Sequence, residues 1–396
     1  MTLISPQEPA PPAARRFVLF ALGFRTFYLL AGLFATFSIA LWAARFSGFL
    51  GDWVYGSDPT WHAHEMIFGY AFAVIVGFLF TAARNWTNQP TPTGATLAAI
   101  AALWLAARVL VLTPWTLLAA AADTAFALAV AAALALPLYR SGNRRNYFFV
   151  ALIVGLGAAN LAFYLAKADL LDLAVGEGLK IALDLILFIM TVMGGRVIPM
   201  FTMNAVPGAK GTRLAWLERA ALGGVLLLIL ADLFDAPGRS VAIVAAAAAL
   251  AHALRLALWQ PWLTLTRPIL WILHAAYAWI PVHLLLRALA AAEIVPDNLA
   301  THALTVGAIG GLTLGMMTRT ARGHSGRPLQ AGATEIVCYV LVQLAAAVRV
   351  FVPLAAPQLL IDAIVASGAL WGIAFALFSA RYFPILVFPR ADGRPD

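Results

Sequence analysis

The feature that most constrains this chain is a succession of apolar runs of about 20 residues, each separated from the next by a short polar gap. A run of that length is what an α-helix needs to cross a bilayer. The 396 residues are 63% hydrophobic and 11% charged, whereas a soluble domain carries about 25% charged residues. Because the gaps are too short for an extramembrane domain, we expect an all-α, polytopic transmembrane helical bundle that forms a single integral membrane domain over residues 1–396.

We expect about twelve transmembrane helices, with the N and C termini cytoplasmic. They are predicted at residues 26–48, 62–83, 94–112, 115–137, 147–166, 179–199, 214–233, 239–259, 268–290, 299–318, 333–353 and 361–387. Residues 1–20 form a short N-terminal segment in this scheme, and residues 388–396 form a tail. The N-terminal segment lacks the apolar core of a signal peptide, so the first helix is expected to be retained as the targeting signal.

Charges in the gaps support this count, because basic residues gather on cytoplasmic loops. Alternate gaps are basic: Arg15, Arg16, Arg84, Arg140, Arg144, Arg145, Lys210, Arg213, Arg267, Arg319, Arg322, Arg327, Arg390 and Arg394. The remaining gaps are acidic: Asp52, Asp58, Asp169, Asp172, Glu177, Asp232, Asp235, Glu293 and Asp297. The net charge of +8 is therefore interpreted as a topology signal, and no nucleic-acid partner is expected.

Motifs for soluble enzymes are absent, with no Walker loop, dinucleotide fingerprint, HExxH or GxSxG in the sequence. The single cysteine, Cys338, excludes an intramolecular disulfide and an all-thiolate zinc or iron–sulfur site. A metal would therefore need imidazole, thioether or carboxylate ligands.

Histidines near the acidic ends of the predicted helices are the first candidates. An ionisable side chain at mid-bilayer costs about 2.5 to 3.5 kcal/mol, so each needs a partner or a role. His62, His64 and Glu65 open the second predicted helix, and His302 opens the tenth. On a regular helix His62 and Glu65 share a face, whereas His62 and His64 are about 200° apart. These residues are interpreted either as metal or haem ligands or as polar anchors of a helix end.

The ninth predicted helix carries two further histidines, His274 and His283. They are nine residues apart, roughly 13 Å along a helix and on opposite faces, so they cannot share a metal ion. His274 lies one turn before Tyr277 and is interpreted as a haem axial ligand or as one half of a buried hydrogen-bonded pair. His252, in the eighth predicted helix, is expected to be structural.

Arginines near the basic ends form a second group: Arg25, Arg196 and Arg319, with His324 in a turn-rich loop nearby. Guanidinium groups at that depth suit haem propionates, or else lipid phosphates and acidic side chains. Three membrane carboxylates and three arginines are interpreted as a proton path or as structural ion pairs. They are Asp123, Asp184 and Asp362 with Arg108, Arg287 and Arg349.

Several of these motifs, in order along nearly the whole chain, resemble the NnrS proteins. They are Gly23-Phe24-Arg25, the run from Trp61 to Met66, Asn85-Trp86, the run from Gly195 to Pro199, Phe201-Thr202, His302 with its Gly-rich helix, and the run from Gly323 to Pro328.

The resemblance implies a bacterial inner-membrane protein that contains haem b and copper and belongs to the response to nitric oxide. By motif position it carries over these residues: His62, His64, Glu65, His302, His324 and Arg196. Together with the depth arguments it makes His62, His64, His274 and His302 candidate metal ligands. Arg25, Arg196, Arg319 and His324 become candidate cofactor-binding residues. The resemblance does not divide the histidines between haem and copper.

The function expected from the resemblance is the binding or detoxification of nitric oxide in nitrosative stress and denitrification. If the chain is an enzyme, we expect a haem- and copper-dependent oxidoreductase in which Glu65 delivers protons from the acidic side. The electron donor and the oligomeric state are not predicted. Alternative functions are a transporter of iron or nitrosylated iron, or a haem or copper assembly factor.

Overall fold

The computed structural model describes residues 17–46, 48–49 and 59–394, and these residues form helices and turns with no β-strand. The all-α fold is thereby confirmed for the described part of the chain. Most of the predicted N-terminal segment and the loop that holds Asp52 and Asp58 lie outside the described residues.

The described residues form fourteen α-helices, which are α1 (Gly23–Phe46), α2 (Pro59–His64), α3 (Phe72–Thr87), α4 (Gly94–Leu110), α5 (Thr116–Arg140), α6 (Phe148–Lys167), α7 (Val175–Ala205), α8 (Ala215–Leu233), α9 (Gly238–Leu258), α10 (Pro268–Ala291), α11 (Asp297–His302), α12 (Gly311–His324), α13 (Ala333–Ala355) and α14 (Leu360–Val387). Two π-helical segments, η1 (Glu65–Ala71) and η4 (Ala303–Gly310), join α2 to α3 and α11 to α12 without a break. Three short 3-10 turns complete the order: η2 (Arg144–Asn146), η3 (Pro261–Thr264) and η5 (Pro357–Leu359).

Ten of the described helical segments are long and apolar enough to cross a membrane. Each predicted span overlaps a helix, but α4 is a shorter apolar helix of 17 residues and α8 is not among the ten. A polytopic membrane protein is thus supported, while twelve crossings and the orientation of the termini stay predictions. Many large apolar side chains face outward, as expected where lipid is the solvent. Examples are Phe37, Leu226, Leu227, Ile243, Leu250 and Ile373.

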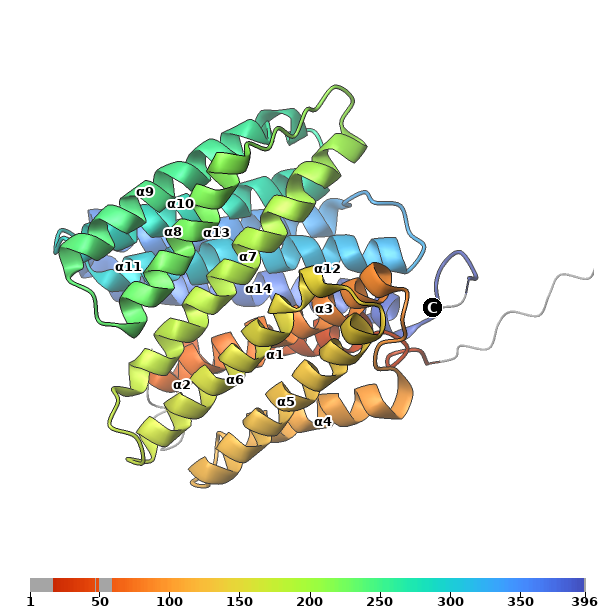
Figure 1. Cartoon of the computed structure of the whole chain (residues 1–396), viewed down its shortest axis with the longest axis horizontal. Helices are drawn as coiled ribbons and strands as arrows, with labels where there is room; N and C mark the ends of the chain where they lie inside the picture. The colour runs from red at the N-terminus through yellow and green to blue at the C-terminus, as the bar shows by residue number, and fades with distance from the viewer. Residues whose placement is uncertain (1–16, 47, 50–58, 395–396) are drawn as a thin grey trace, which may run out of the picture.

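The helices lie side by side in one bundle, with the long α7 crossing between α4–α6 and α8–α9 (Figure 1). Neighbours in the chain pack together, as α5 does with α6 and α9 with α10. The first and the last of the described helices are also in contact, because α14 packs along α1. At the same end the Val18 N–H donates to the Val387 carbonyl at 2.9 Å.

Four segments make up most of the interior: Thr60–Thr87, Val175–Ala205, Pro268–Ala291 and Asp297–His324. Between 61% and 83% of the apolar stretch in each is buried inside the bundle, against 28% to 50% in the other candidate spans. These four segments carry most of the predicted site residues, of which His64, Glu65, His274 and Arg319 are buried.

Candidate functional site

The two π-helical segments each begin directly after a predicted site histidine. The segment η1 starts after His64, and η4 starts after His302. A π-helical turn shifts the residues that follow it around the helix axis, and such turns are frequent at functional sites. Hydrophobic periodicity did not predict either segment, because a π-helix leaves the apolar pattern of a long membrane helix almost unchanged.

His302 contacts Arg349 of α13 near the acidic end of the bundle, and His62 lies within electrostatic range of both; we call these three residues the acidic-end cluster. The Nδ1–H of His302 donates to the Asn298 carbonyl at 2.6 Å, and its Nε2 accepts a hydrogen bond from Arg349 Nη2 at 3.1 Å. The ring of His62 stacks on Trp42 of α1 with centroids 4.8 Å apart and an angle of 9° between the planes.

Two polar atoms of the acidic-end cluster are buried without a hydrogen-bond partner. They are Nδ1 of His62 and Nη1 of Arg349. His62 lies close enough to both other members for their charges to interact. The cluster therefore combines an imidazole nitrogen that has no hydrogen bond, Nδ1 of His62, with a guanidinium group that has unused N–H donors, that of Arg349.

His64 points away from this cluster, as the helical spacing from His62 predicts. Its Nδ1 lies 2.9 Å from Glu65 Oε1, and its Nε2 lies 2.8 Å from Asn160 Oδ1 of α6. The side chain is fully buried. Since both ring nitrogens are already hydrogen-bonded, metal ligation by His64 would have to break one of these bonds.

Glu65 belongs to the same buried network, which α4 and α5 complete. Arg108 Nη1 donates to Glu65 Oε1 at 2.6 Å, and Arg108 Nη2 is hydrogen-bonded to Asp123 Oδ1. The Tyr164 hydroxyl donates to Asp123 Oδ2 at 2.8 Å. Arg108 thus forms an ion pair with Asp123, as in one of the two interpretations of the membrane carboxylates and arginines, and Glu65 is an additional partner that the sequence did not reveal.

His274 is hydrogen-bonded to α7. Its Nε2 lies 2.9 Å from Thr202 Oγ1, and that hydroxyl donates its own proton to the Ile198 carbonyl at 2.9 Å. The imidazole Nε2–H must therefore be the donor, which leaves the lone pair on Nδ1. That Nδ1 is buried and has no partner. The hydrogen-bond partner of His274 is thus Thr202 and not the nearby Tyr277.

His252 has the structural environment that was expected of it. Its Nδ1 lies 2.7 Å from the Tyr277 hydroxyl, and its Nε2 lies 3.2 Å from the Ala221 carbonyl. Both nitrogens are satisfied, and the ring joins α8, α9 and α10.

His283 was not among the predicted site residues, yet its environment suits a ligand. Its Nδ1–H donates to the Ala300 carbonyl at 2.8 Å, and its Nε2 is buried without a partner. Metal-binding histidines commonly have one nitrogen fixed in this way, which orients the other toward the metal. Its only signal in the sequence is its depth, late in α10 and near the level of His302.

At the basic end, Arg25 caps α14. Its Nη1 donates to the carbonyls of Ile385, Leu386 and Phe388 at 3.0, 3.1 and 3.0 Å. A cation suits the last carbonyls of a helix, where the helix dipole is negative. The structure thus gives Arg25 a role in joining α1 to α14.

The other basic-end candidates have different surroundings. Arg196 Nη1 donates to Asn146 Oδ1 at 2.8 Å. The His324 ring lies 5.7 Å from that of Phe24. Arg319 stacks over the Phe201 ring at 3.9 Å, and the described residues give it no hydrogen bond and no acidic partner. Phe201 and Thr202 are adjacent on α7, so Arg319 and His274 flank the same helical turn.

Six arginines of the described part of the chain are buried, and they fall into two groups. Four of them bind carbonyl or carboxylate oxygens: Arg25, Arg108, Arg255 and Arg287. The predicted Arg287–Asp184 pair is present at 2.7 Å. In the described part of the chain, Arg319 and Arg349 have no carboxylate partner, and Asp362 is exposed and forms no pair with Arg349.

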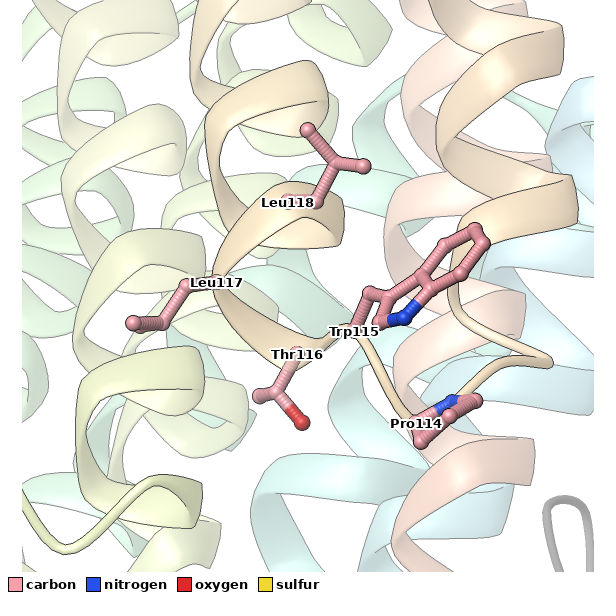
Figure 2. Close-up of a pocket in the computed structure, with 5 residues that line it drawn as sticks. All are labelled: Pro114, Trp115, Thr116, Leu117 and Leu118. Carbon is pink, nitrogen blue, oxygen red and sulfur yellow. The ribbon is translucent and has the colours of Figure 1, made fainter.

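No three side chains of His, Cys, Asp or Glu form a metal-type group within residues 17–46, 48–49 and 59–394. A surface pocket lies at the turn between α4 and α5, where Pro114, Trp115, Thr116, Leu117 and Leu118 project in different directions (Figure 2). It contains no titratable side chain, and Trp115 is 61% exposed. A tryptophan at a helix end suits the membrane interface, so we assign no site to this pocket.

The fold and the buried polar groups define a polytopic helical protein of membrane type whose interior carries histidines and arginines. Comparison with protein families gives a more specific identity. The family model of the NnrS protein matches residues 18–390, and the chain therefore belongs to the NnrS family. A search of curated proteins found no match.

Proposed function

We propose that this member of the NnrS family holds haem b and copper in the bacterial inner membrane and binds or detoxifies nitric oxide there. The supporting observation is the set of buried imidazole nitrogens that have no partner, on His62, His274 and His283. A buried polar atom without a partner costs about 1–3 kcal/mol, and a bond to a metal would remove that cost.

The donors near α7 suit haem b. Haem iron needs one or two axial ligands, and its propionates need cationic partners. His274 has a lone pair on Nδ1 that no described residue binds, Arg319 has no acceptor among the described residues, and both lie against the Phe201–Thr202 turn. We propose His274 as the iron ligand and Arg319 as the propionate partner.

The acidic-end cluster suits copper, for which imidazole is a common ligand. His302 has its Nδ1–H fixed by a backbone carbonyl, and His62 has a free Nδ1. We propose these two residues as copper ligands, with His283 as a further imidazole near the same level. His302 would bind through Nε2, which would then have to release its hydrogen bond from Arg349. A metal with an open position supplies the binding of nitric oxide and, with electrons and protons, its reduction.

Glu65 remains the proposed proton donor. Its Oε1 is hydrogen-bonded to both Arg108 and His64. These hydrogen bonds would have to break or rearrange when Glu65 transfers a proton. The Glu65→Gln variant should reduce nitric oxide more slowly while its haem spectrum is unchanged. Full activity in this variant would reject the assignment.

Optical spectra and metal analysis of the purified protein test the cofactors directly. We expect a Soret band that shifts with nitric oxide, loss of haem in His274→Gln, and loss of copper in His62→Gln and His302→Gln. His252→Gln is the matched control, because both nitrogens of His252 already have protein partners; it should keep both cofactors per folded molecule. A wild-type protein that lacks both cofactors and takes up neither would refute the proposal.

We further propose twelve crossings with both termini cytoplasmic. The alternating loop charges support this topology. Ion pairs also support crossings by α4 and α8, because a charge that is neutralised within the protein can lie in a membrane-spanning helix. Arg108 of α4 is neutralised by Glu65 and Asp123, and Asp232 of α8 is neutralised by Arg287. A green fluorescent protein fused to the C terminus should fluoresce, and alkaline phosphatase fused there should be inactive. The opposite pair of results would show that the orientation is reversed.

A further inference from the structure

We propose that the acidic-end cluster binds a small monovalent anion with two oxygen acceptors in one plane, of the size and shape of nitrite, with Arg349 as the binding group. This inference rests on the proposed function only for the choice of nitrite as the physiological example. The anion site itself rests on the protein groups and needs no metal.

The first argument is charge. Arg349 is one of two buried arginines for which the described residues provide neither a carboxylate nor a carbonyl acceptor, whereas Arg108, Arg255 and Arg287 each bind one or two carboxylates. Arg349 is only 8% exposed. A buried cation without a counter-charge is strongly unfavourable, so a single bound anion would stabilise this site.

The second argument is the free donor. Arg349 Nη1 is buried and has no hydrogen-bond partner. Its Nη2 donates to His302 Nε2 at 3.1 Å, which is a neutral acceptor that compensates no charge. The guanidinium has five N–H groups in a planar fork that matches two coplanar oxygens better than a spherical ion.

The third argument is positioning. The His302 ring is fixed by its 2.6 Å hydrogen bond to the Asn298 carbonyl, so its Nε2 holds the guanidinium in place. The His62 ring is held by stacking on Trp42, and its Nδ1 has no partner. His62 interacts electrostatically with both Arg349 and His302, so an anion beside Arg349 would lie near the His62 ring.

These features also restrict the anion. One uncompensated guanidinium favours a single negative charge, and the low exposure of Arg349 favours a small ion. In the described part of the chain, Arg319 is the other buried arginine with neither a carboxylate nor a carbonyl acceptor; the face of its guanidinium lies against Phe201, and no described imidazole is bonded to it. The acidic-end cluster is therefore the better candidate for a small free anion.

Equilibrium dialysis of the full chain in nanodiscs against isotopically labelled nitrite tests the proposal in metal-stripped protein, where His302 Nε2 is bonded to Arg349. We expect one saturable site and weaker binding in Arg349→Gln by at least about tenfold, as for the loss of a bidentate charged pair. Arg349→Lys keeps the charge but loses the fork, and it should bind nitrite more weakly than wild type. Arg239→Gln removes an exposed arginine at the start of α9 and should bind like wild type.

Formate should compete with nitrite, and chloride should compete much less well. The proposal would be overturned by the absence of saturable binding in the metal-stripped protein, by wild-type affinity in Arg349→Lys, or by equal competition from chloride. Thermal melts show which variants are folded. If Arg349→Gln does not fold, Arg349→Lys still tests the proposal. Metal content is measured separately, so failure of anion binding is distinguishable from failure of the cofactor proposal.

Discussion

At the scale of single residues, Arg108 supplies the positive charge that two buried carboxylates share. Glu65 and Asp123 are 1% and 2% exposed, and both bind the same guanidinium. A buried ion pair contributes little compared with a well-packed apolar contact, but removing one partner is costly because the other charge stays buried.

We therefore expect Arg108→Met to lower the free energy of unfolding by about 3–5 kcal/mol. The triple variant with Glu65→Gln and Asp123→Asn should recover much of that loss, because no uncompensated charge remains. Denaturant titration in detergent micelles measures both, with Arg239→Met as the exposed control. Equal stability of the single variant and wild type would mean that the carboxylates are neutralised in another way.

The sequence predicted some of these residue contacts and missed others for a clear reason. Helical spacing was enough to predict that His62 and His64 contact different neighbours, because this prediction depends only on positions along one helix. The bonds from His274 to Thr202 and from His283 to Ala300 depend on which helices pack together. Such contacts join residues far apart in the chain, and a single sequence does not specify them.

At the scale of elements, glycines let the π-helical segment η4 approach large aromatic rings. A Cβ atom on Gly307 would lie 2.3 Å from Cγ of Trp279. The Trp279 indole is held in place because its Nε1 donates to Gln343 Oε1 at 2.9 Å. The close contact between η4 and α10 therefore requires glycine at this position.

Gly307→Ala should accordingly lower the free energy of unfolding by about 1–3 kcal/mol through overpacking. Gly223→Ala in α8 is the matched control, since no atom lies within 4 Å of the added carbon. That variant should be neutral or gain up to about 1 kcal/mol from helix propensity. Thermal melts of the two proteins would contradict the packing argument if Gly223→Ala were the less stable.

The contact between α1 and α14 gives a second prediction at this scale. Arg25→Met removes the donor that binds three carbonyls at the end of α14. We expect a loss of about 1.5–3 kcal/mol, as for hydrogen bonds to a charged group, and faster amide exchange near residues 382–388. Arg381→Met, on the half-exposed outer side of α14, should leave the exchange unchanged. Slow exchange retained in Arg25→Met would show that other contacts hold this end.

At the scale of the whole molecule, length and hydropathy predicted the helices and their approximate limits. They did not predict which helices lie inside the bundle. Nearly all of the helices are apolar, and a helix that faces lipid has side chains similar to those of a helix that faces protein. Burial of the four interior segments follows from long-range packing, as does the contact of the last helix with the first.

Because the two ends of the bundle meet, the chain should tolerate circular permutation. Joining residue 396 to residue 1 and opening the chain between Ser141 and Gly142 keeps every helix intact and places the new ends in an exposed turn. We expect this permutant to insert and to elute as a single species with the melting temperature of the parent. A permutant opened between Gly194 and Gly195, inside α7, should not fold. Aggregation of the first permutant would mean that the order of synthesis matters.

The packing of α14 along α1 also bears on how the protein is made. Because α14 is synthesised long after α1, α1 must wait in the membrane for these contacts until α14 has been translated. During that interval the buried guanidinium of Arg25 has none of the α14 carbonyls that later receive it. Insertion factors that shelter polar groups of unfinished membrane proteins should therefore be needed most for the first segment of this chain.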